Sequence, residues 1–280
     1  MKFKVTSHLE YDVRSPSTFI FNIHALRTKN QTVLEETLSL DPFFKTAEIN
    51  SSVSENRFLR LDVDKPTNLR IVYTATVESY FQILDMKLLN AIPMVQLEGN
   101  ILPYLFPSRY CQSDKLFKLA QDKFGKIENL YGKVLAINDW IFNNVEYLSG
   151  STNSQTSAFD TVTERAGVCR DFAHLGIALC RALSIPARYF TGYSYQLNPQ
   201  DFHACFEAYI GGQWIIFDAT KLSPLNGLVK IATARDAADA SVASIFGNVE
   251  STYVKVSCEL LEQNFFPLFY NPGEMKGISY

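Results

Sequence analysis

Three residue types that together perform nucleophilic acyl transfer occur in the second half of the sequence, at Cys169, His203 and Asp218. A thiolate attacks a carbonyl carbon, an imidazole takes and later returns the proton, and a carboxylate holds the imidazole in its working tautomer and orientation. Such general acid–base assistance typically accelerates a reaction by about 10²–10⁴-fold. Whether these side chains can act together depends on the elements that carry them.

The stretch GVCRDFAHLGIALCRAL, residues 167–183, predicts an amphipathic helix with Cys169 at or near its first turn. Unpaired N–H groups and the positive end of the helix dipole collect there, and both stabilise a thiolate over a thiol. With an imidazolium nearby, such a cysteine can reach a pKa of roughly 3.5–7.5. The alternative is a buried structural cysteine, which is the role we expect for Cys180 in the middle of the same helix.

His203 and Asp218 lie in a predicted β-hairpin, HACFEAYIGGQWIIFDAT, in which two alternating runs flank a Gly-Gly turn at 211–212. With those two glycines as the loop, Cys205 lies opposite Asp218. His203 shares the face of Cys205, so Asp218 is its diagonal neighbour, within reach of longer side chains. A slip of one residue would separate the imidazole from the carboxylate. The alternative is a structural histidine in a sheet and an aspartate that caps a loop.

The composition limits the class of protein. The 280 residues are 47% hydrophobic and 20% charged, as in soluble globular proteins, and the net charge of −3 gives no electrostatic case for nucleic acid or an anionic membrane surface. No apolar run reaches the length of about 18 residues that spans a bilayer, and the N-terminus alternates polar and apolar residues instead of forming a signal segment. Five cysteines without regular spacing argue against a disulfide framework, so we expect a cytoplasmic protein.

The hydrophobic periodicity of the sequence changes near residue 95. Residues 1–95 contain short runs with period-two alternation, which predict an antiparallel β-sandwich-like domain. Residues 96–280 begin with helical periodicity and return to period two after Pro186, and helices followed by strands predict an α+β domain. A short helix should precede Cys169, with Ser157 or Thr156 as its cap and Gly167 at its end.

The stretch SAFDTVTERAGVCRDFAHLGIALCRALSIPARYFTGY, followed by HACFEAYIGGQWIIFDAT, resembles the core of the transglutaminase-like superfamily, a papain-like fold with a Cys-His-Asp triad. The segments at 104–114, 151–158 and 234–239 are similar to segments that flank this core in bacterial members. The β-rich first third resembles the N-terminal domain that accompanies them. Together the matches cover nearly the whole chain in the right order.

The resemblance implies that Cys169 is the nucleophile, His203 the general base and acid, and Asp218 the residue that orients His203. It implies a thioester acyl-enzyme formed from a peptide or protein substrate. Hydrolysis, as in a cysteine protease, is expected because bacterial members are generally regarded as protease-like. The alternatives are transfer to an amine, as in a transglutaminase, or a non-catalytic binding scaffold, which the complete triad disfavours. No cofactor, metal, nucleic acid or membrane partner is expected, and the oligomeric state stays open.

The chain departs from the pattern of bacterial relatives at two positions. They commonly have Trp two residues after the histidine, where this chain has Cys205, and often Pro after the aspartate, where it has Ala219. Neither change touches the triad, but Cys205 would crowd Asp218 if the predicted pairing is right. Soft metal ligands are also offered by Cys169, His174, His203 and Cys205, but these residues lack the spacing of a zinc motif.

Two further expectations concern the first turn of the nucleophile helix. The backbone N–H of Cys169 should contribute to an oxyanion hole, with the second donor open between Trp140, Trp214 and the side chains of residues 151–155. Asp171 should make a favourable contact with the helix dipole. His174, five positions after the cysteine, should be a packed residue of the helix.

Overall fold

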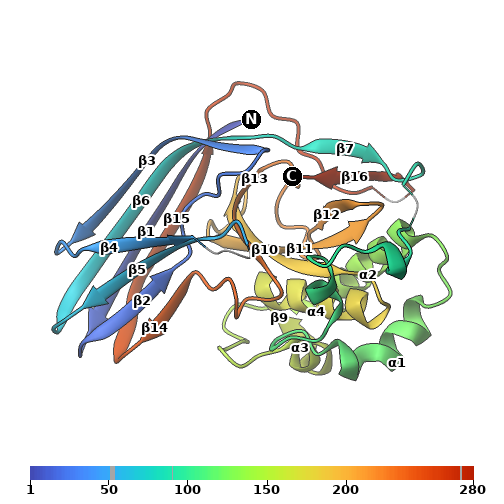
Figure 1. The fold of residues 1–280 in the computed structure, drawn as a ribbon, viewed down its shortest axis with the longest axis horizontal. Helices are drawn as coiled ribbons and strands as arrows, with labels where there is room; N and C mark the ends of the chain where they lie inside the picture. Colours follow the sequence, from blue (N-terminus) through green and yellow to red (C-terminus); the bar gives the residue numbers. More distant parts are fainter. Residues whose placement is uncertain (51–53, 90, 272) are drawn as a thin grey trace.

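The strands expected in the N-terminal third form most of a sandwich of two antiparallel sheets (Figure 1). The computed structural model describes residues 1–50, 54–89, 91–271 and 273–280. The sheet orders are β15-β1-β6-β3 and β14-β2-β5-β4. The strands are β1 (Lys2–Val13), β2 (Ser17–Phe21), β3 (Gln31–Asp41), β4 (Thr46–Asn50), β5 (Arg57–Val63), β6 (Thr67–Ser79), β14 (Ala243–Phe246) and β15 (Val249–Leu260). Alternate residues of β1 and β6 are buried, as the period-two pattern predicted.

Two of these eight strands come from the C-terminal part of the sequence. β15 pairs with β1 from Phe3–Leu260 to Val13–Val249, with one register shift, and β14 pairs with β2. In Figure 1 the red-orange strands accordingly lie among the blue ones. The domain boundary near residue 95 stays a prediction, while the sandwich itself contains strands from both ends of the chain.

The rest of the chain packs helices on a four-stranded antiparallel sheet of order β12-β11-β10-β13, which gives the α+β fold that the order of elements predicted (Figure 1). The helices are α1 (Ser113–Phe124), α2 (Leu130–Asn144), α3 (Ala158–Glu164) and α4 (Cys169–Ala182). The strands of the sheet are β10 (Ala187–Ser194), β11 (Phe202–Ile210), β12 (Gln213–Phe217) and β13 (Leu228–Ala234). Two short strand pairs lie outside it: β7 (Gln82–Asp85) pairs with β16 (Lys276–Ser279), and β8 (Glu146–Tyr147) pairs with β9 (Ala166–Gly167). Among the described residues, no helix has both the length and the apolar character needed to cross a membrane.

Helix α4 packs against one face of this sheet through β11. The ring of Phe206 lies against Gly176 so closely that a Cβ at that glycine would come within 2.6 Å of the ring. Phe206 also stacks on Phe217 of β12, at 5.4 Å between ring centroids. Because side chains alternate along a strand, the neighbours Cys205 and Glu207 point to the opposite face. Cys205 there belongs to a second, smaller cluster with residues such as Phe190, Ile216 and Leu228.

The end of α3 differs from the prediction. The helix begins after Ser157 as expected, and both the N–H and the hydroxyl of Ser157 donate to Asp160. It ends at Arg165, which adopts the left-handed conformation with φ 56°, and not at Gly167. Gly167 lies in β9, where a Cβ would come within 2.9 Å of the Asp171 side chain. The glycine therefore allows the first turn of α4 to lie close against β9.

Candidate active site

Cys169 is the first residue of α4, as predicted, and its side chain is partly exposed. Asp171, two residues after Cys169, caps the start of the helix. Its carboxylate is fully buried and accepts the N–H of Val168 at 3.0 Å. Arg170 donates to the other oxygen of Asp171 at 2.9 Å. The negative charge that we expected near the start of the helix is therefore present and is paired with a guanidinium.

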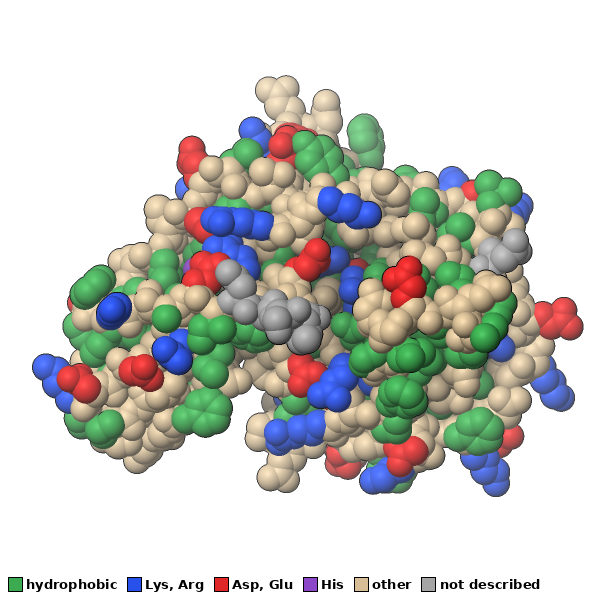
Figure 2. All heavy atoms as spheres, viewed as in Figure 1, with side chains coloured by type: hydrophobic (Ala, Val, Ile, Leu, Met, Phe, Trp, Pro, Cys, Tyr) green, Lys and Arg blue, Asp and Glu red, His purple; other side chains and the backbone are tan. Residues whose placement is uncertain are grey.

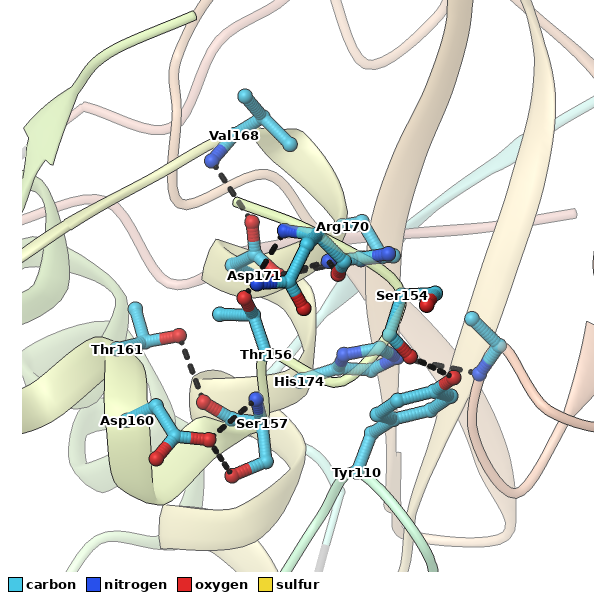
Figure 3. Close-up of polar contacts among 12 residues, drawn as sticks. Tyr110, Ser154, Thr156, Ser157, Asp160, Thr161, Val168, Arg170, Asp171 and His174 are labelled. Carbon is cyan, nitrogen blue, oxygen red and sulfur yellow. Dashed lines mark hydrogen bonds and ion pairs between the residues drawn. The ribbon is translucent and has the colours of Figure 1, made fainter. Parts of the chain in front are cut away.

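Figure 3 shows how the loop before α3 is tied to this turn. Arg170 donates to the carbonyl of Asn153 at 2.8 Å, and the Tyr110 hydroxyl donates to the carbonyl of Ser154 at 2.7 Å. The Tyr110 ring stacks on His174, at 5.0 Å between centroids, and His174 Nε2 accepts the N–H of Ala237. Burial holds the pKa of His174 well below its ordinary value, so this imidazole is neutral and packed, as expected.

The hairpin forms in the predicted register. Ile210 pairs with Gln213 across the two-glycine turn, and the ladder continues to the pair Phe206–Phe217. Both glycines have positive φ, as the turn requires. Asp218 follows the end of β12, and its Oδ2 lies 2.9 Å from Nε2 of His203. The imidazole and the carboxylate that the register predicted to be neighbours therefore form a direct hydrogen bond.

This pair is almost completely buried, with exposed side-chain fractions of 1% for His203 and 2% for Asp218. Burial alone would lower the pKa of His203, but the charge and hydrogen bond of Asp218 and the thiols around the ring hold it well above its ordinary value. Burial alone would raise the pKa of Asp218, but His203 and two hydrogen bonds from Thr220 lower it. Around neutral pH the pair is therefore an imidazolium and a carboxylate.

Cys169 is one of the groups that raise the pKa of His203, so its thiol lies near the same imidazole. Nδ1 of His203 is buried and has no nitrogen or oxygen partner among the described residues, so this second ring nitrogen is free to exchange a proton with sulfur. The other four cysteines are buried, and burial raises the pKa of each of their thiols. Cys169 is thus the one cysteine that combines partial exposure, a helix N-terminus and an imidazolium.

Cys205 lies beside the His203–Asp218 pair, as the register implied. Ligand-type atoms of the three residues all lie within 4.8 Å of one another. Burial raises the pKa of the Cys205 thiol to about 12, so it stays protonated at neutral pH. Histidine, cysteine and aspartate are also residue types that bind zinc. Strand register brings these three together although their positions in the sequence match no zinc motif.

Tyr147 is a candidate that the sequence analysis missed. The parallel bridge between β8 and β9 pairs it with Gly167, and the N–H of Leu148 donates to the Gly167 carbonyl at 3.0 Å. Its hydroxyl lies near Cys169 and His203, both of which act on its pKa. Burial raises the pKa of Tyr147 to about 12, so the hydroxyl keeps its proton at neutral pH. A two-residue bridge leaves no periodic pattern in the sequence.

The two tryptophans proposed as oxyanion donors are engaged elsewhere. Trp140 packs edge-on against Phe124 of α1, and Trp214 lies under the guanidinium of Arg188. In the loop at residues 151–155, the Ser151 hydroxyl donates to the Leu148 carbonyl at 2.7 Å, and Asn153 Oδ1 accepts the Gln155 N–H at 2.7 Å. The second oxyanion donor stays a prediction.

Both regions of the chain match known family models. Residues 1–100 match the model described as "Bacterial transglutaminase, N-terminal domain", and residues 118–219 match the model described as "Transglutaminase-like superfamily". The second match includes Cys169, His203 and Asp218.

The chain is similar to a crystal structure named "Putative Cysteine Protease" from Cytophaga hutchinsonii. The two are 64% identical with a TM-score of 0.98, and the match covers 100% of this chain and 97% of the other. An uncharacterized protein of Mycobacterium leprae is 23% identical over 279 residues, which covers 92% of this chain and 98% of the relative. The uncharacterized protein YebA of Bacillus subtilis is 27% identical over 53% of this chain and 23% of its own length.

Proposed function

This chain belongs to the transglutaminase-like superfamily, and on that basis we propose that it hydrolyses peptide or amide bonds with Cys169 as nucleophile. The observation that carries the proposal is a partly exposed thiol at a helix N-terminus, close to an imidazole that a buried carboxylate holds by a hydrogen bond of 2.9 Å. This arrangement pairs a nucleophile with a base and the base with an orienting group.

In the first half of the reaction, the Cys169 thiolate attacks the carbonyl carbon of the scissile amide, and the carbonyl oxygen becomes an oxyanion. The His203 imidazolium then protonates the leaving nitrogen, the C–N bond breaks and a thioester remains. In the second half, neutral His203 takes a proton from water, whose oxygen attacks the thioester carbon. The C–S bond breaks, the acid leaves, and the Cys169 thiolate and the His203 imidazolium are restored. Asp218 keeps Nε2 occupied, so that Nδ1 exchanges the protons.

The oxyanion would be stabilised by the backbone N–H of Cys169 at the start of α4 and by the hydroxyl of Tyr147. The position of Tyr147 supports this role, since its hydroxyl lies near both Cys169 and His203. The exposed fraction of Tyr147 is 44%, so a substrate can reach its hydroxyl. Donors fixed at the place where charge develops lower the barrier because they need no reorganisation.

Tyr147→Phe should therefore lower kcat by about tenfold to a hundredfold and leave KM nearly unchanged, because the lost hydrogen bond forms only in the transition state. The measurement is steady-state hydrolysis of a fluorogenic peptide amide. Tyr253→Phe, a partly exposed tyrosine of the sandwich, is the matched control and should keep the wild-type rate. A kcat for Tyr147→Phe equal to that of the control would show that the second donor lies elsewhere.

The proposal is tested first by the rate of iodoacetamide modification of each cysteine from pH 4 to 9, read by peptide mass spectrometry. Cys169 should react much faster than the four buried thiols, and His203→Ala should remove that difference. If Cys169 reacts no faster than Cys180, the thiolate–imidazolium pair does not exist and the catalytic proposal fails. A primary amine added to a turnover assay separates the acceptors: its incorporation into product would indicate amine transfer in place of hydrolysis.

A further inference from the structure

A cavity of about 540 Å³ lies between the β-sandwich and the sheet that carries His203. The loop at 28–30 of the sandwich, Tyr104, and residues of β10, β12 and β13 line it. Figure 2 shows this face hollowed between its two halves, with lysine and arginine side chains gathered beside the hollow. Cys169, His203 and Asp218 are not among the lining residues, so this cavity is separate from the candidate active site.

Three charged side chains of adjacent strands meet at the floor of the cavity. Arg188 of β10 lies directly across from Glu207 of β11, and the Arg188 Nε–H donates to that carboxylate. Lys230 of β13 donates to the other oxygen of Glu207 at 3.2 Å. Glu207 is fully buried, and the exposed fraction of the Lys230 side chain is only 8%. All three lie on the face of the sheet turned away from α4.

The cluster carries two positive charges and one negative charge, so one cationic charge is left without a partner in a largely buried site. Glu207 is shared, and among the described residues no hydrogen bond engages the two terminal nitrogens of Arg188. The exposed Lys29 and Glu55 also line the cavity, and the charge of Glu55 acts on Lys230; with both counted, one positive charge is still in excess. A buried charge without a partner is costly, and a compact anion seated on Arg188 and Lys230 would remove that cost.

The cavity wall next to the cluster is aromatic. The Arg188 guanidinium lies 4.2 Å from the ring centroid of Trp214, and Tyr104 packs edge-on against the same indole at 5.2 Å. Contact with the indole fixes the position of the guanidinium, and its two terminal nitrogens make no hydrogen bond among the described residues. A guanidinium held in this way can donate two parallel hydrogen bonds to one planar or tetrahedral anion.

We infer that this cavity is a binding site for a small anion, a carboxylate or a phosphate group, which Arg188 and Lys230 contact while Glu207 holds them in place. Glu207 lies four residues from His203 along β11, or about 13 Å at strand geometry. The anion would thus bind on the same strand as the candidate base but outside reach of the Cys169 thiol. The inference does not depend on the proposed hydrolase activity.

The two tryptophans of the chain allow a direct test. In a Trp140→Phe background, the remaining fluorescence comes from Trp214, which contacts Arg188. The full chain is titrated, at constant ionic strength, with inorganic phosphate, with a short peptide that ends in a free carboxylate, and with the same peptide as its C-terminal amide. We expect a saturable change with phosphate, with the free-acid peptide or with both, and none with the amide. Phosphate alone would identify a phosphate source, and the peptide alone a carboxylate source.

Two variants show whether the contacts are those inferred. Arg188→Lys keeps the charge next to Glu207 but removes the terminal nitrogens, and Lys230→Met removes one cation; each should weaken the response at least about tenfold. Arg14→Gln, which breaks an exposed ion pair on the far part of the sandwich, is the matched control. Urea unfolding shows whether a variant stays folded. The inference is overturned if no probe changes Trp214 fluorescence, or if Arg188→Lys, still folded, binds as tightly as the control.

Discussion

Replacing Cys169 with alanine should abolish amide hydrolysis, with a loss in kcat of about 10⁴-fold or more, because no other group near His203 can form the acyl-enzyme. Cys205, the other thiol beside the imidazole, is buried and its raised pKa keeps it protonated. The measurement is turnover of a panel of fluorogenic peptide amides by the purified full chain. Cys180→Ala, a buried cysteine of the same helix, is the matched control and should keep the wild-type rate when folded.

The same assay can show that the residues act as one unit. His203→Ala should cost nearly as much as Cys169→Ala, and the double variant should be hardly slower than either single variant, because a thiol without its base is as inactive as no thiol. Additive losses would mean that the two residues contribute independently and would contradict the proposed mechanism. Substantial activity of Cys169→Ala would assign the nucleophile to another residue.

Asp218→Asn should destabilise the protein by about 3 kcal/mol near pH 6, because it removes the charged partner of a buried ion pair. The depressed pKa of Asp218 stabilises the fold above its unfolded value of 3.8, and this contribution is lost as the pH falls through the folded value. The raised pKa of His203 stabilises the fold fully below 6.5, and this contribution is lost as the pH rises through the folded value. The difference from wild type should therefore be largest between about pH 4 and 6.5.

Urea unfolding at several pH values from 4 to 10 measures this dependence. The matched control is Asp139→Asn, which removes the same charge from an exposed pair with Lys221 and should cost less than about 1 kcal/mol at every pH. A free-energy difference for Asp218→Asn that is equally small, or that does not change with pH, would mean that His203 and Asp218 do not form a charged pair in solution.

The features that local sequence predicted correctly each depend on a few neighbouring residues. Two glycines between alternating runs determine the hairpin register, and that register brings His203, Cys205 and Asp218 together. Helical periodicity placed Cys169 at the start of α4, and the start of α3 was expected at Ser157 or Thr156, of which the structure shows Ser157. The end of α3 was wrong because Arg165 adopts the left-handed conformation that glycine usually takes, while Gly167 is required for close packing.

The features that could not be predicted depend on contacts between distant segments. Tyr147 lies near Cys169 because the two-residue strands β8 and β9 pair with each other. The charged floor of the proposed anion site forms because β10 pairs with both β11 and β13. In the sequence, Arg188, Glu207 and Lys230 are ordinary charged residues of strands, and only the packing of the sandwich on the sheet buries them. The cytoplasmic location and the peptide substrate stay predictions.

The pairing of β15 with β1 has a consequence for synthesis on the ribosome. Strand β1 leaves the exit tunnel before the other strands of the sandwich, yet its partner on one side, β15, lies some 250 residues later in the chain. At about 5–20 residues per second, β1 waits on the order of ten seconds or more with one edge unpaired. During that time α4 and the hairpin are already available, so the triad can assemble before the sandwich closes. An exposed edge strand invites aggregation, and this nascent chain should therefore depend on early chaperone contact with its first strands.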